Sequence, residues 1–205
     1  RSNTKKQIFI IENPSVPFVY NSTKQEKKRG FSFTGNLGRL QRIPLLIDAI
    51  KKYLQKGGVM EFAFAGGGIY ANEILNLSKD YSLIKYFGVV PSHQAASISN
   101  KYEWALAPID DQITNYAFPS KISTYACTGA KILAICSENT SVAKWVKNNQ
   151  VGLTVKPDID AITDIFSIIE KNNIDKTFIN LDRRKLRKIL CMDEFVNNIR
   201  SKIFF

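Results

Sequence analysis

The chain has 205 residues, which suits one domain of ordinary size or two very small ones. Hydrophobic residues make up 44% of it and charged residues 23%, which excludes a disordered tail, a collagen-like fibre and a disulfide-stapled mini-protein. The formal net charge is +11, which indicates an anionic partner such as nucleic acid, a phosphorylated ligand or a membrane surface.

Short β-type runs alternate with helical patterns along the chain. The predicted strands are Phe31–Thr34, Met60–Ala65, Ile84–Val90, Trp104–Pro108, Lys131–Cys136 and Gly152–Val155. The predicted helices are Leu45–Leu54, Ile69–Leu77, Ser92–Ile98, Lys121–Cys127, Val142–Val146 and Asp160–Glu170. This alternation predicts an α/β fold, a Rossmann-like three-layer sandwich with a parallel sheet of about six strands. Ligands of such sheets bind beyond the carboxyl ends of the strands, so the loops there are the candidate site.

The first of these loops, Gly35–Arg42 (GNLGRLQR), joins a predicted strand to a predicted helix. Glycines let backbone amides approach a ligand closely, and a helix start offers unpaired N–H groups to an anion. Arg39 and Arg42 add permanently charged, forked donors that suit phosphate oxygens. The loop is either a cradle for a diphosphate or a tight turn with solvated arginines, because GNLG is neither a GxGxxG nor a Walker sequence.

A run of three glycines, Gly66, Gly67 and Gly68, follows the second predicted strand. Three glycines are more than a turn requires, and a bulky ligand can use the space that missing side chains leave. The alternative interpretation is a flexible turn between strand and helix, and the run by itself favours that alternative.

The segment Asn115–Lys121 (NYAFPSK) precedes a predicted helix. Pro119 fixes the direction of approach, and Ser120 is predicted to cap the helix. Lys121 then lies at the helix N-terminus, where a cation is unfavourable by itself. We interpret Lys121 as a residue that shares a negative ligand with the helix; the alternative is a surface lysine without a role.

Other residues that could carry chemistry are interpreted as structural. His93 is the only histidine and is predicted to be a solvated residue in a first helical turn. The pair Asp110 and Asp111 is typical of turn and cap residues. The three cysteines are widely spaced and form no CxxC pair, so we expect no metal site, no structural disulfide and a cytoplasmic location. No apolar run approaches the roughly 18 residues of a membrane span, and no signal peptide is visible.

Four segments in this order resemble the donor-binding, C-terminal domain of GT-B-fold glycosyltransferases, in the large family four group. They are FTGNLGRLQRIPLLIDAI, FAFAGGG, IKYFGVVPSHQAASI and WALAPIDDQITNYAFPSKISTYACTGAKILAI, and the match as a whole runs from about Phe31 to Lys171. The part with PSK is similar to enzymes that build bacterial surface polysaccharides. The resemblance implies transfer of a hexose-type sugar from a nucleotide diphosphate, by default a UDP-sugar, to a surface polysaccharide or lipid-linked acceptor. It implies no cofactor besides this substrate, and no metal.

The resemblance also implies which residues meet the donor phosphates. Gly35 and Asn36 would face them, because they match the glycine loop of the family. Gln41 falls where many members have a lysine for the diphosphate, so Arg39 or Arg42 would supply that charge.

The nucleoside end of the donor is implied in the same way. Gly88 to Val90 would run beside the base. Thr124 falls where the family commonly has a glutamate for the ribose hydroxyls, and Tyr116 where an earlier glutamate often lies. No catalytic residue is assigned. The expected donor-binding residues are Gly35, Asn36, Arg39, Gln41, Arg42, Gly66, Gly67, Gly88, Val90, Tyr116, Pro119, Ser120, Lys121 and Thr124.

The expected organisation is a crossover or linker segment at 1–30, a nucleotide-sugar-binding domain at 31–180 and a basic helical tail at 181–205. Since a GT-B enzyme needs two such domains, we expect the N-terminal acceptor-binding domain as a missing partner, and no sugar transfer by these residues alone. The charged blocks Ser22–Arg29 and Asp182–Lys188 indicate contact with an anionic membrane at the inner face of the plasma membrane. An apolar tail face with Phe195, Val196, Ile199 and Ile203 could drive self-association.

Two other functions remain open. A non-enzymatic regulatory or assembly module with a vestigial donor pocket would explain Thr124 and Tyr116 at the usual acidic positions. A nucleic-acid-binding domain would explain the charge, but the chain has no recognisable reader motif and its aromatic residues alternate within strands as core residues do. We therefore expect no nucleic-acid partner.

Overall fold

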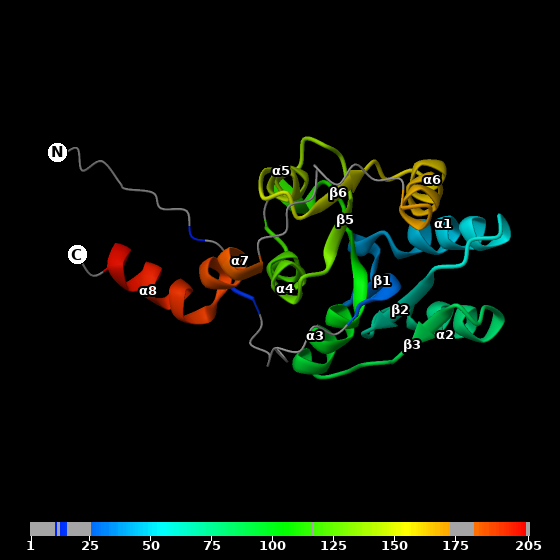
Figure 1. Cartoon of the computed structure of the whole chain (residues 1–205), viewed down its shortest axis with the longest axis horizontal. Coiled ribbons are helices and arrows are strands. Elements are labelled where there is room, and N and C mark those ends of the chain that lie inside the picture. Colours follow the sequence, from blue (N-terminus) through cyan, green and yellow to red (C-terminus); the bar gives the residue numbers. More distant parts are fainter. Residues whose placement is uncertain (1–10, 12, 16–25, 116, 173–182, 204–205) are drawn as a thin grey trace.

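The computed structural model describes residues 11, 13–15, 26–115, 117–172 and 183–203. Six strands form one sheet (Figure 1). They are β1 (Lys28–Thr34), β2 (Glu61–Ala65), β3 (Ile84–Tyr86), β4 (Tyr102–Pro108), β5 (Lys131–Ile135) and β6 (Gly152–Val155). The helices are α1 (Ile43–Gln55), α2 (Ala71–Asp80), α3 (Ser92–Lys101), α4 (Ser120–Thr128), α5 (Ser141–Asn148), α6 (Ile159–Glu170), α7 (Arg183–Leu190) and α8 (Met192–Ile203). Two short 3-10 turns, Arg39–Gln41 and Ile113–Asn115, lie in the loops.

All the strand pairs of this sheet are parallel, in the order β3-β2-β1-β4-β5-β6. The chain leaves β1 toward β2 and β3 and then returns to place β4 on the other side of β1. The loops after β1 and β4 therefore diverge, and a crevice opens between them at the carboxyl edge of the sheet. This is the predicted Rossmann-like fold, and it puts the candidate site beyond β1 and β4.

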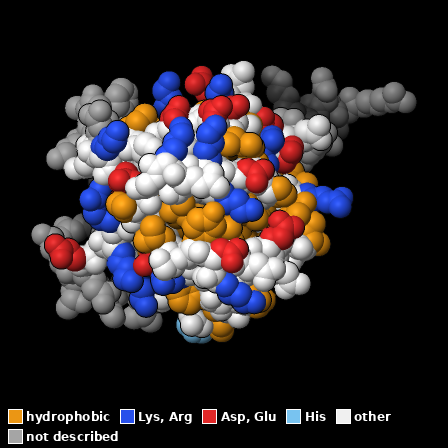
Figure 2. Space-filling model, turned by 90° about the vertical axis from the view of Figure 1, so that its right-hand side faces the viewer, with side chains coloured by type: hydrophobic (Ala, Val, Ile, Leu, Met, Phe, Trp, Pro, Cys, Tyr) orange, Lys and Arg blue, Asp and Glu red, His pale blue; other side chains and the backbone are white. Residues whose placement is uncertain are grey.

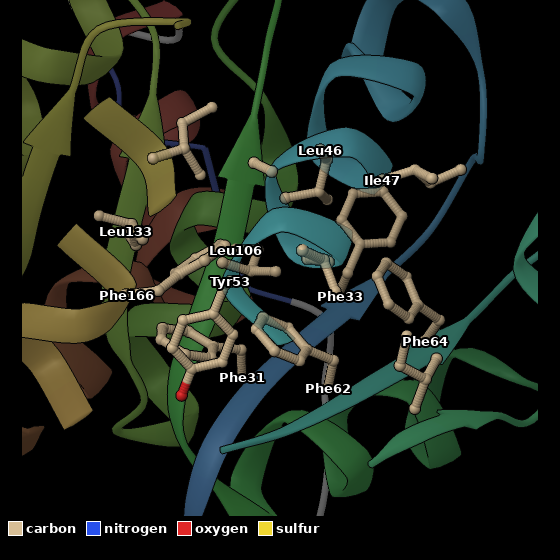
Figure 3. Packing of buried hydrophobic residues seen from close by; sticks show 14 of the residues in the cluster. Phe31, Phe33, Leu46, Ile47, Tyr53, Phe62, Phe64, Leu106, Leu133 and Phe166 are labelled. Atoms are coloured by element: carbon tan, nitrogen blue, oxygen red, sulfur yellow. The ribbon is translucent and has the colours of Figure 1, made fainter. Parts of the chain in front are cut away.

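The two faces of the sheet carry side chains of different size. Phe31 and Phe33 of β1 and Phe62 and Phe64 of β2 are buried among α1 and α6 (Figure 3). The rings of Phe31 and Phe62 stack with centroids 5.0 Å apart, and Phe166 from α6 lies 4.8 Å from Phe31. Offset and tilted aromatic pairs of this kind add stabilisation beyond their buried area.

The opposite face of the sheet is lined by small residues. Ala63, Ala65, Ala105 and Ala107 alternate with the aromatic and large aliphatic residues along β2 and β4, and all four are buried. Strand side chains point alternately to the two faces, so this pattern puts methyl groups against the helices of the second layer. The short side chains let α3 and α4 approach the sheet closely, which brings their N-terminal ends to its carboxyl edge.

Most predicted elements are confirmed, and a few boundaries were wrong. Strand β1 begins at Lys28, so the end of the expected connector Ser22–Arg29 belongs to the sheet; residues 22–25 lie outside the described residues. Strand β3 ends at Tyr86 and not at Val90, because Gly88 has φ +67 and turns the chain. The expected basic tail is helical, as α7 and α8.

On one face of the molecule, positive charge is interspersed with negative charge. On the face shown in Figure 2, Lys and Arg side chains alternate with Asp and Glu around a central band of hydrophobic side chains. Four lysines with nearby carboxylates and one arginine between two aspartates account for the ion pairs found among the described residues. Every helix in the described ranges is too short or too polar to cross a lipid bilayer.

Candidate functional site

Three glycine-containing turns meet at the carboxyl edge of β1, β2 and β3. The backbone N–H of Gly35 donates to the carbonyl of Ala65 at 2.7 Å, and that of Gly66 to the carbonyl of Gly88 at 2.7 Å. A Cβ atom on Gly66 would lie 1.8 Å from the Gly35 carbonyl oxygen, and its φ of +138 already disfavours a side chain. The glycines are thus needed for backbone-to-backbone contact, and this contact makes the floor of the site.

Lys121 extends across this floor from the first turn of α4. A Cβ on Gly35 would lie 1.7 Å from its Nζ atom, and the same Nζ lies 5.2 Å from the centre of the Phe33 ring. Burial lowers the pKa of Lys121, because the charged form loses its hydration. Among the described residues, no ion pair or hydrogen bond to its ammonium group is found. A largely buried cation with only an aromatic ring beside it lacks a balancing negative charge, so Lys121 is a candidate anion-binding group.

Two pockets adjoin Lys121, one on each side. The larger has about 260 Å³ and lies between the glycine turns and the start of α3. The smaller has about 200 Å³ and lies under the loop that follows β4. Ser120, Lys121 and Tyr125 line both. The lysine therefore stands between two hollows, as a cation would between the two ends of a ligand with a central anionic group.

Tyr125 fixes α4 to the end of β1. Its hydroxyl donates to the Thr34 carbonyl at 3.1 Å and accepts from the Thr34 backbone N–H at 3.1 Å. The side chain is 1% exposed, and burial raises the pKa of its hydroxyl. Sequence reasoning missed this residue, because a tyrosine on a predicted helix has the ordinary signature of a core residue. Its place four residues after Lys121, on the same helix face, is the signal that could have found it.

Arg42 is held by protein groups. Its Nε donates to the Ile109 carbonyl at 3.1 Å, and its Nη2 lies 3.6 Å from a carboxylate oxygen of Asp110 and 3.6 Å from one of Asp111. Burial acts to raise the pKa of Asp111, but hydrogen bonds from Ser137 and the charge of Arg42 outweigh it and hold that pKa below its usual value. Arg42 therefore braces the loop after β4, and the charge it carries is already balanced.

The other residues expected near the phosphates are spread around the glycine turns. Asn36 is exposed and folds over Gly38 and Gly68, close enough that a Cβ on Gly68 would lie 2.7 Å from its Oδ1. Arg39 is exposed and lines neither pocket. Gln41 lines the smaller pocket.

Two of the residues expected at the nucleoside end, Val90 and Thr124, line the larger pocket. Gly66 also lines it, and Gly67 lies close by, since a Cβ there would meet a methyl group of Val89 at 3.0 Å. Gly88 contributes its carbonyl to the backbone contact with Gly66. Tyr116 lies outside the described residues.

The segment before α4 differs in one respect from the prediction. Pro119 occupies the N-cap position and Ser120 is the first helical residue, with no side-chain cap hydrogen bond, so the predicted Ser120 cap is wrong. Proline takes the cap because its fixed φ suits the extended approach. This leaves the first N–H groups of α4 unsatisfied by a side chain beside Lys121.

The structural residues behave as predicted. His93 is exposed in the first turn of α3. Asp110 accepts a hydrogen bond from the backbone of Gln112 at 3.0 Å, and Asp111 from that of Ser137 at 3.0 Å. Within the ranges that the structure describes, no group of His, Cys, Asp and Glu side chains is arranged to hold a metal ion.

A parallel sheet in this order defines a Rossmann-like α/β domain, and its glycine turns and buried cation at the β1–β4 crevice make the carboxyl edge the candidate ligand site. Solved structures of this fold include the pneumococcal O-GlcNAc transferase GtfA, in complex with UDP and GlcNAc. That chain matches with a TM-score of 0.60 and 14% identity, over 94% of this chain and 37% of its own. TarM matches with a TM-score of 0.64 and 13% identity, over 97% of this chain and 39% of its own. Sucrose-phosphate synthase from Thermosynechococcus elongatus matches with a TM-score of 0.61 and 15% identity, over 85% of this chain and 45% of its own.

At the level of sequence, the chain is 26% identical over 156 residues to the probable glycosyltransferase WbjE of Pseudomonas aeruginosa. The match covers 75% of this chain and 38% of that protein. No protein-family model matches. These likenesses agree with the resemblance on which the prediction was based: the chain has the fold of one domain of GT-B glycosyltransferases, and its sequence is similar to that of a probable glycosyltransferase. It spans less than half the length of the relatives it matches.

Proposed function

We propose that this domain binds the nucleotide diphosphate sugar that a glycosyltransferase uses as donor. The observation that carries the proposal is Lys121, a largely buried ammonium group without a carboxylate partner among the described residues, between two pockets. A diphosphate would supply the missing negative charge. Its two substituents, nucleoside and sugar, would extend into the two pockets.

The larger pocket is the proposed nucleoside side. It is lined by the ends of β1 and β2, by Val90 and by the first turns of α3 and α4. Thr124 lies there with a short hydroxyl side chain where the resembling family commonly has a carboxylate. UDP is the proposed nucleotide, supported by its presence in the structure of the O-GlcNAc transferase GtfA.

The chemical role of the site follows from its charge. Sugar transfer breaks the bond between the anomeric carbon and the diphosphate, so negative charge grows on the leaving oxygen. Lys121 and the open N–H groups of α4 would be placed to balance that charge as it forms, and they need little rearrangement because packing already fixes them. We assign no acid or base, and we propose that the acceptor site lies in a further domain.

Calorimetric titration of the 205-residue chain with UDP, UDP-sugars and GDP tests the proposal. We expect saturable binding of a nucleotide diphosphate, lost on Lys121→Met and retained in the matched control Lys79→Met, in which an exposed lysine of α2 is changed the same way. Binding unchanged by Lys121→Met, or no binding of any nucleotide at millimolar concentration, would overturn it. The second result would favour the module with a vestigial pocket.

The acceptor is a separate proposal. We propose that the parent enzyme adds a hexose-type sugar to a surface polysaccharide or lipid-linked acceptor at the inner face of the plasma membrane, and that the 205 residues alone do not transfer it. The coverage of 38% of the curated relative supports the second part. Exposed Lys188 and Ile189 on α7, with Met192 at the start of α8, support the membrane contact.

Sedimentation with lipid vesicles separates this contact from donor binding. The chain should co-sediment with vesicles of phosphatidylcholine and phosphatidylglycerol and release at high salt, and Lys188→Glu should weaken the binding severalfold without changing UDP affinity. Equal binding to pure phosphatidylcholine would contradict an electrostatic contact. Robust turnover by the 205 residues, in an assay with radiolabelled sugar, would contradict the need for a further domain.

A further inference from the structure

The smaller pocket beside Lys121 has mostly apolar walls. Carbon atoms of Phe33, Leu106, Ile109 and Ile122 line it, together with Ala107 and two prolines. A sugar that carries only hydroxyl groups would have to leave some of them against this wall without hydrogen bonds, which costs free energy. The wall therefore favours a donor sugar with an apolar substituent.

The polar side chains of the pocket are Gln41, Ser120, Lys121 and Tyr125, and the Oε1 atom of Gln41 lies on the side of Gly38. Gln41 lines the pocket, and its Oε1 atom is buried without a hydrogen-bond partner among the described residues. A buried acceptor without a partner is uncommon, since it loses its hydrogen bonds to water and gains none in the protein. A half-turn of the last torsion exchanges the oxygen and nitrogen of this side chain, so the same amide can accept or donate.

We infer that the donor sugar carries an acetamido group and that the smaller pocket is its binding site. The methyl group would lie against Leu106, Ile109 and Ile122, and the amide would pair with the side-chain amide of Gln41. An acetamido group offers a methyl, an N–H and a C=O in one plane, which matches both the apolar wall and the unsatisfied amide. The inference rests on the proposed function, because it places the diphosphate on Lys121 between the two pockets.

Calorimetric titration of the 205-residue chain with four ligands tests this. UDP measures the nucleotide alone, and UDP-glucose, UDP-6-deoxyglucose and UDP-N-acetylglucosamine differ in the substituent. We expect the acetamido sugar to bind about tenfold more tightly than UDP-glucose, an effect of the size that a polar site shows against a ligand without the matching group. Equal affinity for the acetamido sugar and UDP-glucose, or tighter binding of the 6-deoxy sugar, would overturn the inference.

Gln41→Leu gives the residue-level test. It should bring the affinity for UDP-N-acetylglucosamine to within about twofold of that for UDP-glucose, both measured relative to the affinity of the same variant for UDP. Gln55→Leu, at the exposed end of α1, is the matched control and should keep the preference. A preference that survives Gln41→Leu would contradict the assigned role. UDP binding without any sugar preference overturns this inference alone, whereas absence of UDP binding overturns the proposed function as well.

Discussion

Two basic residues, Arg42 and Lys121, border the same crevice, and they differ in whether a carboxylate balances their charge. Arg42 enters the left-handed region with φ 46, and its guanidinium lies between Asp110, Asp111 and the Ile109 carbonyl. Lys121 lies against Gly35 and the Phe33 ring, without a carboxylate partner among the described residues. Both residues looked like phosphate ligands in the sequence. The difference favours Lys121 over Arg42 as the candidate anion-binding residue, because the charge of Arg42 is already balanced by protein groups.

The largest expected effect concerns the backbone contact on which Lys121 rests. Gly66→Ala places a Cβ 1.8 Å from the Gly35 carbonyl oxygen at φ +138, and should cost about 3–5 kcal/mol of unfolding free energy. Gly57→Ala is the control, since that glycine also has positive φ (+86) but nothing within 4 Å, and should cost about 1 kcal/mol. Urea denaturation measures both. Similar losses would show that backbone conformation, and not the close contact, makes Gly66 necessary.

Lys121→Met separates binding from stability. Loss of a charge-assisted contact to a diphosphate should weaken nucleotide binding by about 10–100-fold, while the unfolding free energy stays the same or rises, because a buried charge is removed. Calorimetry and urea denaturation on the same preparation measure the two quantities. A loss of stability in parallel with affinity would mean that Lys121 is a structural residue, like Arg42.

Tyr125→Phe tests how α4, and with it Lys121, is held to β1. Removing the hydroxyl leaves the N–H and carbonyl of Thr34 unsatisfied in a buried place, which should cost about 1–3 kcal/mol. Denaturation measures the loss, and nucleotide titration should show a smaller effect than for Lys121→Met. Tyr86→Phe is the control in the same crevice. It removes a part-buried tyrosine hydroxyl, which donates to the Gly66 carbonyl at 2.8 Å and does not contact α4 or Thr34 in the hydrogen bonds found.

The smallest effect should come from the balanced charge. Asp111→Asn should cost about 1 kcal/mol at neutral pH, by weakening its contacts with Arg42 and Ser137. The pKa of Asp111 is lowered in the folded state, so its contribution is present above the unfolded pKa of about 4 and is lost as pH falls through the folded value. Denaturation at pH 7 and at pH 3 should show the difference between variant and wild type shrinking. A difference that does not change with pH would contradict the ionic role.

Much of the fold was predictable because hydrophobic spacing dictates it. Alternating large residues in Phe31–Thr34 and Met60–Ala65 and helical spacing in Leu45–Leu54 predicted strands and a helix that the structure contains. The end of β3 was misjudged, since the apolar run to Val90 continues past Gly88, where backbone geometry and not hydrophobicity decides the turn.

The candidate site was predicted in part. Lys121 was singled out by its place at a helix start, and the structure brings it to Gly35 and Gly66. The neutralisation of Arg42 was not foreseen, because it depends on Asp110 and Asp111, 68 and 69 residues further along the chain. Tyr125 was missed for the same reason, as its partner Thr34 lies 91 residues away.

The amino-acid sequence by itself determined the class of fold, the order of strands and helices, and the segments that resemble GT-B glycosyltransferases. Those properties are local: periodicity, turn residues and short motifs act over a few residues. Only the tertiary structure decided which cation is balanced, which glycines touch backbone and which side chains line the pockets beside Lys121. Charge compensation and burial are set by residues far apart in the sequence, and they become visible only when the sheet brings those residues to one edge.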